Sequence, residues 1–252
     1  MQRRLASLRA DHYCPVCNSR VDAFDPLPEY FAEYGRKYGW PYREEDAETC
    51  NINHYSCPFC GASDRERLYS LYLRDYLPNL KKKGSIDIVD FGPSEPFSRF
   101  IRSLSGKISY RTADLFAEGV DDRVDITEMR IYSDNQYDFF ICSHVLEHVN
   151  DDRKALRELY RILKPGGKGI LMVPIVVSLT EIDEDPSETD EGERWRRFGQ
   201  GDHVRIYSKA GFIERVKEAR FQIEELREHY FNSEVFARAG ISSKSILYIV
   251  HK

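Results

Sequence analysis

The chain has 252 residues, 41% of them hydrophobic, which is enough to bury the core of one large domain together with a small module. Its net charge of −5, with both signs mixed along the sequence, argues against a general binder of nucleic acid or other polyanions. No apolar stretch follows the basic N-terminus, and the most apolar run, residues 169–179, is too short to cross a bilayer. We therefore expect a cytoplasmic protein without a membrane partner, whose six cysteines are thiols or metal ligands.

Two Cys-x-x-Cys turns lie near the N-terminus. Cys14 and Cys17 form the first, and Cys57 and Cys60 form the second. Each turn presents two thiolates to one ion, so together they predict a closed, tetrahedral zinc site of structural type. The 39 residues between the pairs exceed the usual gap of a zinc ribbon, but an insertion can loop out at small entropic cost. Four unrelated buried thiols, or a redox pair, are the alternatives.

The segment between the two cysteine pairs is rich in aromatic residues. Aromatic rings beside basic residues can stack on nucleic acid bases, but residues 1–63 carry only seven Lys and Arg against nine Asp and Glu. We therefore expect a zinc-ribbon-like module that packs through its aromatic residues against its neighbour, with an acceptor-contacting surface as the alternative. The remainder, residues 64–252, is expected to form the larger domain.

Strands and helices alternate from residue 64 onwards. The expected strands are residues 85–91, 108–115, 137–144, 168–177, 222–226 and 245–252, and the expected helices are residues 64–77, 96–104, 151–164 and 207–221. Pro165, Gly166 and Gly167 are expected to stop the third helix, and Ser208 is the expected N-cap of the fourth. Alternation of this kind predicts an α/β fold with a doubly wound parallel sheet, which binds its ligands at the carboxyl ends of the strands.

Acidic residues follow the first strands at informative positions. Asp90 ends the first strand and Asp114 ends the second, 24 residues later. At this spacing an acidic residue reaches a pair of ribose hydroxyls in dinucleotide-type folds. Asp125 and Ile126 lie in the loop before the next strand, where a carboxylate can accept from an exocyclic amine while an apolar neighbour covers a base. The pattern indicates a cofactor with a nucleoside part.

The run "YDFFICSHVLEHVNDDRKALRELYRILKPGGKGILMVP" resembles the central signature of class I S-adenosylmethionine-dependent methyltransferases, in the broad type-11 group. The resemblance covers roughly residues 86–252. The cysteine pairs followed by "GASDRERLYSLYL" also resemble a bacterial subset with an N-terminal zinc-ribbon-like part. The family resemblance implies a Rossmann-like, seven-stranded sheet with an antiparallel last strand, and S-adenosylmethionine as the cofactor.

The resemblance also implies a role for individual residues. The cofactor-binding residues that it implies are Asp90, Gly92 and Ser94 for the methionine part, Asp114 for the ribose hydroxyls, Asp125 and Ile126 for the adenine, and Ser143 and His144 after the fourth strand. The first motif departs from the family at Ser94 and Pro96, where glycine is usual. S-adenosylmethionine has no pyrophosphate. The loop that binds it therefore has less need of glycines, which expose the backbone, than the loop of an NAD site has. We interpret the loop as functional but atypical, with an inactive relic fold as the alternative.

Two other polar groups receive a structural interpretation. Glu147 and His148 look like a metal or acid–base pair, but the same letters are common in this group, so we interpret them as mainly structural. The acidic stretch 181–193 lacks the spacing of a metal cage, and we expect it to be a solvated, mobile lid.

The acceptor is inferred from what the sequence lacks. There is no "NPPY"-type motif, which is associated with methylation of nucleobase amino groups, and there is no basic face. We expect a small hydroxylated acceptor, with a sugar, glycan precursor or nucleotide-sugar as the specific hypothesis. The rival hypotheses are an RNA or protein methyltransferase guided by the zinc module, and a catalytically inactive, zinc-stapled interaction protein.

The catalytic hypothesis rests on the segment "GDHVRIY", which follows a long polar excursion after the strand 168–177. We expect it to place Asp202, His203 and Arg205 over the acceptor site. A neutral imidazole is a suitable base for a hydroxyl, so His203 is the expected base, with Asp202 positioning the loop. Arg205 is expected to bind a phosphate or carboxylate of the acceptor. The alternative is that the segment merely anchors the following helix.

Overall fold

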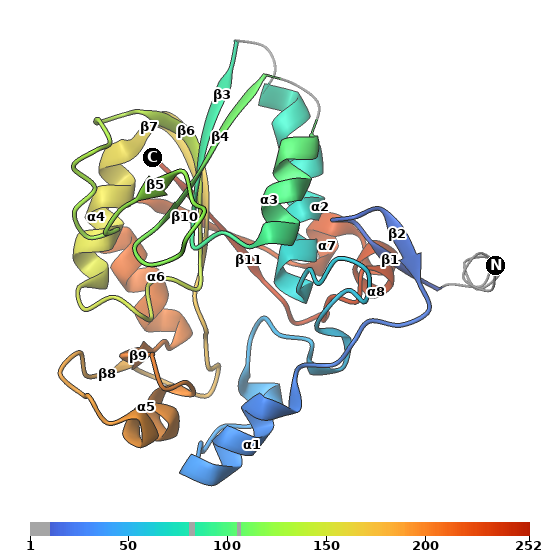
Figure 1. Ribbon diagram of the computed structural model, residues 1–252, viewed down its shortest axis with the longest axis vertical. Coiled ribbons are helices and arrows are strands. Elements are labelled where there is room, and N and C mark those ends of the chain that lie inside the picture. Colours follow the sequence, from blue (N-terminus) through green and yellow to red (C-terminus); the bar gives the residue numbers. More distant parts are fainter. Residues whose placement is uncertain (1–10, 81–83, 105–106) are drawn as a thin grey trace.

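The computed structural model describes residues 11–80, 84–104 and 107–252, and a seven-stranded sheet forms its centre (Figure 1). In the order of the sheet, the strands are β10 (Gln222–Leu226), β11 (Leu247–His251), β7 (Leu163–Met172), β6 (Tyr137–Ser143), β3 (Ile86–Phe91), β4 (Ile108–Asp114) and β5 (Asp122–Arg123). Strand β11 runs antiparallel to both of its neighbours, and the other neighbouring strands pair in parallel. The expected Rossmann-like sheet with an antiparallel last strand is therefore confirmed.

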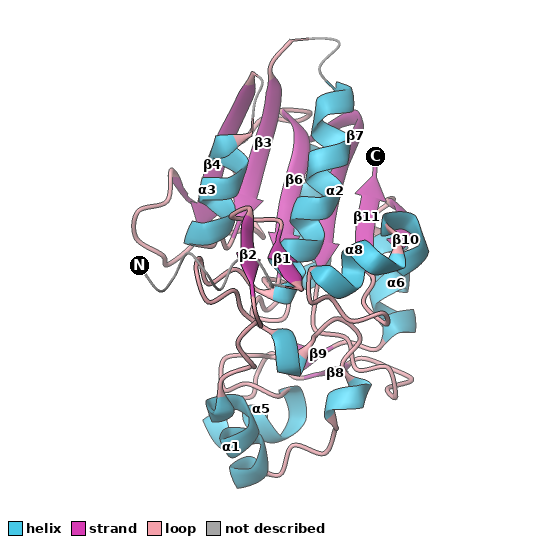
Figure 2. Cartoon of the chain, turned by 90° about the vertical axis from the view of Figure 1, so that its right-hand side faces the viewer, coloured by secondary structure: helices cyan, strands magenta, loops and turns pink. Residues whose placement is uncertain are grey.

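Helices cover both faces of the sheet. Helices α2 (Asp64–Leu80) and α3 (Glu95–Ser103) lie on one face, and α4 (Asp152–Ile162) and α6 (Lys209–Glu218) lie on the other (Figures 1 and 2). The central strands β3 and β6 are consequently buried along almost their whole length, as parallel strands between helical layers are. Two short helices, α7 (Glu228–Phe231) and α8 (Ser233–Arg238), connect β10 to β11. No helix among these described residues has the length and apolar character needed to cross a membrane.

The helix boundaries have local chemical causes. Ser208 caps α6 as expected, because its hydroxyl accepts from the backbone N–H of Gly211. Helix α4 ends at Ile162, slightly before the expected stop. Strand β7 then begins at Leu163 and takes Pro165 and the following glycines into an irregular stretch of its pairing with β6.

The aromatic insertion near the N-terminus packs against the second half of the chain. Its helix α1 (Glu29–Tyr38) lies beside α5 (Glu191–Phe198), below the sheet in Figures 1 and 2. Tyr30, Tyr34 and Tyr38 share one face of α1, and all three rings contact the buried Trp195 of α5. The expected packing through aromatic residues is therefore present, although the helix itself was not foreseen.

The rest of the N-terminal part contains a small hairpin and two single turns. Strands β1 (His12–Cys14) and β2 (Ser19–Val21) pair antiparallel, and η3 (Glu44–Asp46) and η4 (Ile52–His54) are 3-10 turns. The connection to the sheet is held by Arg67, which is fully buried. Its guanidinium donates to carbonyl oxygens of His54, Ala62 and Ala239. The division of the chain into residues 1–63 and 64–252 remains a prediction. The hydrogen bonds of Arg67 join the two parts.

The acidic stretch 181–193 contains no buried residue, but several of its carboxylates have ionic partners. Strand β8 (Asp183–Glu184) pairs with β9 (Arg205–Ile206), and Asp183 also forms an ion pair with Arg197 at 2.5 Å. Glu184 binds the guanidinium of Arg215 at 2.5 Å. Helix α5 begins at the end of the stretch, where Asp190 caps it. These pairs were not expected, because the basic partners lie 12 to 31 positions away in the chain, and the mobility of the stretch stays a prediction.

Candidate functional site

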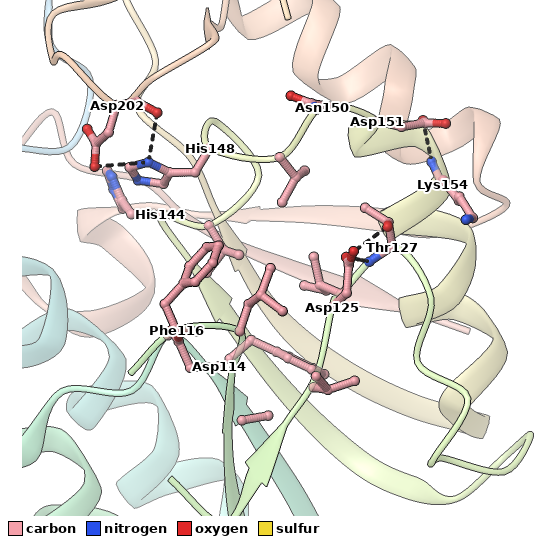
Figure 3. Close-up of a pocket in the computed structure, with 18 residues that line it drawn as sticks. Asp114, Phe116, Asp125, Thr127, His144, His148, Asn150, Asp151, Lys154 and Asp202 are labelled. Carbon is pink, nitrogen blue, oxygen red and sulfur yellow. Dashed lines mark hydrogen bonds and ion pairs between the residues drawn. The ribbon is translucent and has the colours of Figure 1, made fainter. Parts of the chain in front are cut away.

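Two adjoining cavities open at the carboxyl ends of the central strands. The larger, of about 830 Å³, lies beyond β3, β4 and β6 (Figure 3), and we call it the adenosine chamber after the cofactor part expected there from the sequence resemblance. The smaller, of about 370 Å³, lies between β3, β6 and the start of α2, and we call it the methionine chamber. Gly92 and His144 line both chambers, so the two meet at these residues.

The adenosine chamber brings together Asp114, Asp125 and Ile126, as expected from the sequence. Oδ1 of Asp114 accepts from the backbone N–H groups of Phe116 and Ala117, at 2.7 and 2.8 Å. These bonds fix the carboxylate at the chamber wall and leave the lone pairs of Oδ2 for a ligand. The exposed ring of Phe116 lines the same chamber, a contribution that the sequence interpretation missed.

The methionine chamber brings together Asp90, Ser94 and Ser143. Asp90 is buried, and its Oδ2 accepts from the hydroxyl of Tyr110 at 2.6 Å. Burial outweighs this hydrogen bond and raises the pKa of Asp90 to about 7. The hydroxyl of Ser143 lies 2.8 Å from that of Tyr69.

The first-motif loop is unstrained despite its missing glycines. Only Gly92 needs a positive φ, of 64°, and a Cβ there would lie 3.0 Å from Cγ2 of Val145. Ser94 has an ordinary φ of −95° and caps α3, with its hydroxyl accepting from the N–H of Phe97. Pro96 lies in the first turn of α3, where proline is tolerated. The loop therefore keeps the backbone cradle that a ligand needs at Gly92.

Helix α2 supplies the wall of the methionine chamber that the sequence interpretation missed. Glu66 accepts a hydrogen bond from the hydroxyl of Ser94, and Nη1 of Arg65 lies 2.6 Å from Nε2 of His144. Tyr69 lines the same wall. The polar sequence "DRER" at the start of an otherwise apolar helix could have indicated that these side chains serve a site.

The residues of the expected catalytic segment have three different environments. Asp202 lines the adenosine chamber, and its side chain is 71% exposed. His203 is buried, and its ring packs edge-on against that of His148, with centroids 4.7 Å apart. His148 itself lines the chamber, and its Nδ1 lies 3.4 Å from Oδ2 of Asp202 (Figure 3). Of His148 and His203, the imidazole that faces the chamber is therefore His148, which the sequence interpretation treated as structural.

Arg205 does not face either chamber. It is 1% exposed, and its guanidinium donates to the carbonyl oxygens of Leu146, Val149 and Asn150. Its Nε lies 3.2 Å from Glu184. With these partners Arg205 holds the loop after β6 in place, so the expected contact with an acceptor anion finds no support in this geometry.

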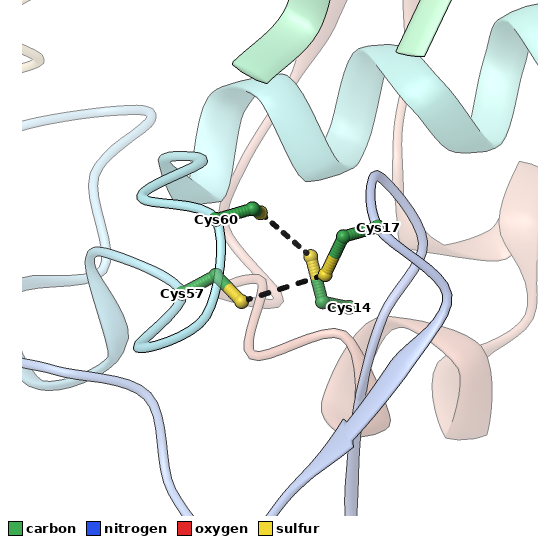
Figure 4. A group of neighbouring side chains, drawn as sticks. All are labelled: Cys14, Cys17, Cys57 and Cys60. Atoms are coloured by element: carbon green, nitrogen blue, oxygen red, sulfur yellow. Dashed lines mark hydrogen bonds between the residues drawn. The ribbon is translucent and has the colours of Figure 1, made fainter. Parts of the chain in front are cut away.

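The four cysteines of the two Cys-x-x-Cys turns lie together, as Figure 4 shows. Sγ of Cys14 lies 3.8 Å from that of Cys60, and Sγ of Cys17 lies 3.8 Å from that of Cys57. A tetrahedral ion with Zn–S bonds of about 2.3 Å separates its sulfurs by roughly 3.8 Å, so the thiol set fits zinc. We call these residues the four-cysteine cluster.

Comparison with known proteins identifies the family. The family model described as "Methyltransferase domain" matches residues 62–226, which is well over half of the chain. The chain belongs to this methyltransferase family. The chain is an S-adenosylmethionine-dependent methyltransferase. The residues of the two chambers suit this cofactor, because Gly92 leaves room at their junction and carboxylates line each chamber.

Curated relatives of this methyltransferase match only locally. A ubiquinone/menaquinone biosynthesis C-methyltransferase of Hydrogenovibrio crunogenus is 44% identical over 55 residues, which is 20% of this chain and 22% of the relative. Its counterpart from Klebsiella pneumoniae is 40% identical over 53 residues, covering 20% and 21%. The chain thus spans about a fifth of the length of these relatives.

The similar solved structures are more distant in sequence. The [4+2]-cyclase SpnF is 16% identical with a TM-score of 0.48, and the match covers 91% of this methyltransferase and 97% of the cyclase. The CurJ carbon methyltransferase is 14% identical with a TM-score of 0.47, and the match covers 74% of this chain and 52% of the CurJ chain.

Proposed function

We propose that this methyltransferase transfers a methyl group to the hydroxyl oxygen of a small acceptor, with a sugar or nucleotide-sugar as the specific class. The observation that carries the proposal is the pair of chambers meeting at Gly92 and His144. The adenosine part of S-adenosylmethionine would occupy the chamber of Asp114, and its methionine part the chamber of Asp90.

S-adenosylmethionine supplies an activated methyl group, and transfer to a hydroxyl oxygen releases one proton. The chain's contribution is to hold the acceptor oxygen in line with the methyl–sulfur bond and to promote loss of that proton. His148 is the group placed for the second task, because it lines the adenosine chamber with Asp202 beside its Nδ1. In this proposal His203 acts through His148, whose ring it packs against.

Transfer to carbon is the second candidate. It is favoured by the local match to curated C-methyltransferases. Incubation with methyl-labelled S-adenosylmethionine and a panel of nucleotide-sugars, free sugars and phenols tests the acceptor class. A labelled methyl ether of a sugar is the expected product. A label on carbon, or on co-purified nucleic acid or protein, would contradict the proposal.

The Asp114→Ala substitution is expected to weaken S-adenosylmethionine binding by about 2 kcal/mol, or roughly 30-fold, because a charge-assisted bond to the ribose is lost. Titration calorimetry measures this change. Asp114→Asn should lose less, because an amide oxygen can still accept from the N–H groups of Phe116 and Ala117. Glu118→Ala is the matched control, since this exposed carboxylate lies outside the chamber lining. Equal affinity in Asp114→Ala and wild type would remove Asp114 from the cofactor site.

Asp90 is expected to make the stability of the protein without cofactor depend on pH. Its folded-state pKa of about 7 lies above the unfolded value of about 3.9, so the folded state binds more protons between these values. The stabilising contribution is therefore present at pH 4 and is lost as the pH rises through 7. Relative to Asp90→Asn, wild type should lose about 2 kcal/mol of unfolding free energy between pH 5 and pH 8. Urea denaturation at both pH values measures this difference, and parallel pH profiles would contradict it.

A further inference from the structure

Glu147 is a buried carboxylate without a matching cation. Its side chain is fully buried in the loop after β6, and neither carboxylate oxygen makes a hydrogen bond within the described ranges. Nδ1 of His144 lies 3.1 Å from Oε1, and Nε2 of His148 lies 4.0 Å from the same oxygen. No lysine or arginine of those ranges forms an ion pair with it. Burying an ionised carboxylate costs several kcal/mol unless a positive charge balances it.

Two imidazoles complete a group of metal-ligating atoms around this carboxylate. One ligand atom each from Glu147, His148 and His203 lies within 4.8 Å of the other two. Ligands at about 2.1 Å from one tetrahedral ion lie roughly 3.4 Å apart, so the most separated of these atoms would need to approach by at most about 1.4 Å. We call these three residues the Glu-His-His cluster.

The hydrogen bonds of both imidazoles leave a nitrogen available for a metal. Nδ1 of His203 lies 3.1 Å from the carbonyl oxygen of Phe198, and Nδ1 of His148 lies 3.3 Å from the carbonyl oxygen of Asp202. Because a carbonyl oxygen can only accept, Nδ1 of each ring carries a proton, which leaves Nε2 as the nitrogen that can bind a metal. Histidines that bind metals typically donate their second N–H to an oxygen in this way.

His144 has a different role. Its Nε2 accepts from the guanidinium of Arg65 at 2.6 Å, because arginine can only donate. Because Nε2 accepts this hydrogen bond, the ring proton lies on Nδ1, which faces Oε1 of Glu147 at 3.1 Å. His144 therefore orients the carboxylate and offers no lone pair of its own to a cation.

We propose that Glu147, His148 and His203 bind one divalent transition-metal cation at the wall of the adenosine chamber. Two imidazoles and one carboxylate suit zinc, manganese, iron or cobalt better than magnesium or calcium, which prefer oxygen ligands. Three protein ligands leave coordination positions open, as in catalytic metal sites. This cation site is separate from the four-cysteine cluster, whose thiols form a closed set.

The site also deepens the proposed function, on which this step rests. His148 lines the chamber, so the open positions of a cation beside it are within reach of an acceptor in that chamber. In this arrangement His148 promotes loss of the acceptor's proton as a ligand of the cation, because coordination lowers the pKa of a hydroxyl, and the released proton passes to solvent. The acceptor oxygen then forms its bond to the methyl carbon while the methyl–sulfur bond breaks, with the electron pair staying on sulfur. The Glu-His-His cluster would favour acceptors with a hydroxyl that can bind the cation.

Manganese is the probe for the test, because it favours nitrogen and oxygen ligands over the thiols of the four-cysteine cluster. The full chain is first loaded with a single equivalent of Zn²⁺, which the four thiols of the four-cysteine cluster take up in preference. Titration of this protein with Mn²⁺, followed by electron paramagnetic resonance of the free ion, should show one bound Mn²⁺ per chain. Glu147→Gln and His148→Ala should each weaken this binding at least about 50-fold. The matched control His229→Ala, which alters an exposed histidine outside the cluster, should bind as wild type does. Equal Mn²⁺ affinity in wild type and both cluster variants, or no binding to wild type, would overturn the inference.

Two variants and two binding measurements distinguish failure of the metal site from failure of the proposed reaction. Glu147 is buried, but His148 has a side chain that is 35% exposed, so His148→Ala gives a folded variant if Glu147→Gln does not. S-adenosylmethionine affinity is measured by calorimetry on the same samples. Cofactor binding without Mn²⁺ binding would overturn the metal site alone. Mn²⁺ binding without methyl transfer to any hydroxylated acceptor would leave the metal site and overturn the proposed reaction.

Discussion

The Cys57→Ser substitution is expected to release about one zinc ion per chain and to destabilise the N-terminal part by at least about 3 kcal/mol, since binding to a structural site contributes directly to folding. Cys57 contributes one of four thiols whose spacing fits a tetrahedral ion. Without it the remaining thiols cannot complete that coordination. Elemental analysis measures the zinc, and hydrogen exchange over residues 11–63 measures the loosening.

The effect should extend to the methionine chamber. The second cysteine turn directly precedes α2, whose Glu66 binds Ser94 and whose Arg65 binds His144. Loosening of the turn should therefore also weaken S-adenosylmethionine binding. Cys50→Ser is the matched control, because this thiol lies outside the four-cysteine cluster and its variant should keep the zinc. Zinc-free wild-type protein from zinc-supplemented cells would contradict the structural metal site.

The His148→Ala substitution should lower turnover by about 100-fold or more, with little change in S-adenosylmethionine affinity. The imidazole faces the adenosine chamber with Asp202 beside its Nδ1, so it is placed to act on the acceptor rather than to hold the cofactor. His203→Ala should have a similar effect on turnover, because it removes the ring that packs against His148. Steady-state kinetics with the acceptor found by screening, together with calorimetry, separate the two quantities.

His229→Ala controls for the loss of an imidazole as such, since this histidine is exposed on the short helix α7. Its turnover should match that of wild type. A His148→Ala variant that keeps full turnover would show that proton loss from the acceptor does not depend on the histidine cluster. A variant that loses cofactor affinity in proportion to turnover would assign His148 to cofactor binding instead.

Local chemistry in the sequence was sufficient for the framework of this methyltransferase. The order of strands, the cap at Ser208 and the pairing of the two Cys-x-x-Cys turns depend on residues close together in the chain or on regular spacing. The positions of Asp90 and Asp114 followed in the same way, because parallel strands bring their carboxyl ends to one edge of the sheet. The tyrosines of α1 recur at intervals of four residues, which is a local signal for a helix, although the expected elements did not include this helix.

Tertiary structure alone decided which polar side chains serve the site. Arg205 and His203 are buried by the loop after β6, whereas His148 faces the chamber. Arg65 reaches His144 although 79 residues separate them. The periodicity of apolar residues predicts which side chains of a single helix or strand are buried. The imidazoles beside Glu147, the arginines that pair with Glu184, and the wall that α2 adds to the methionine chamber depend on contacts between elements, and only the folded chain determines these.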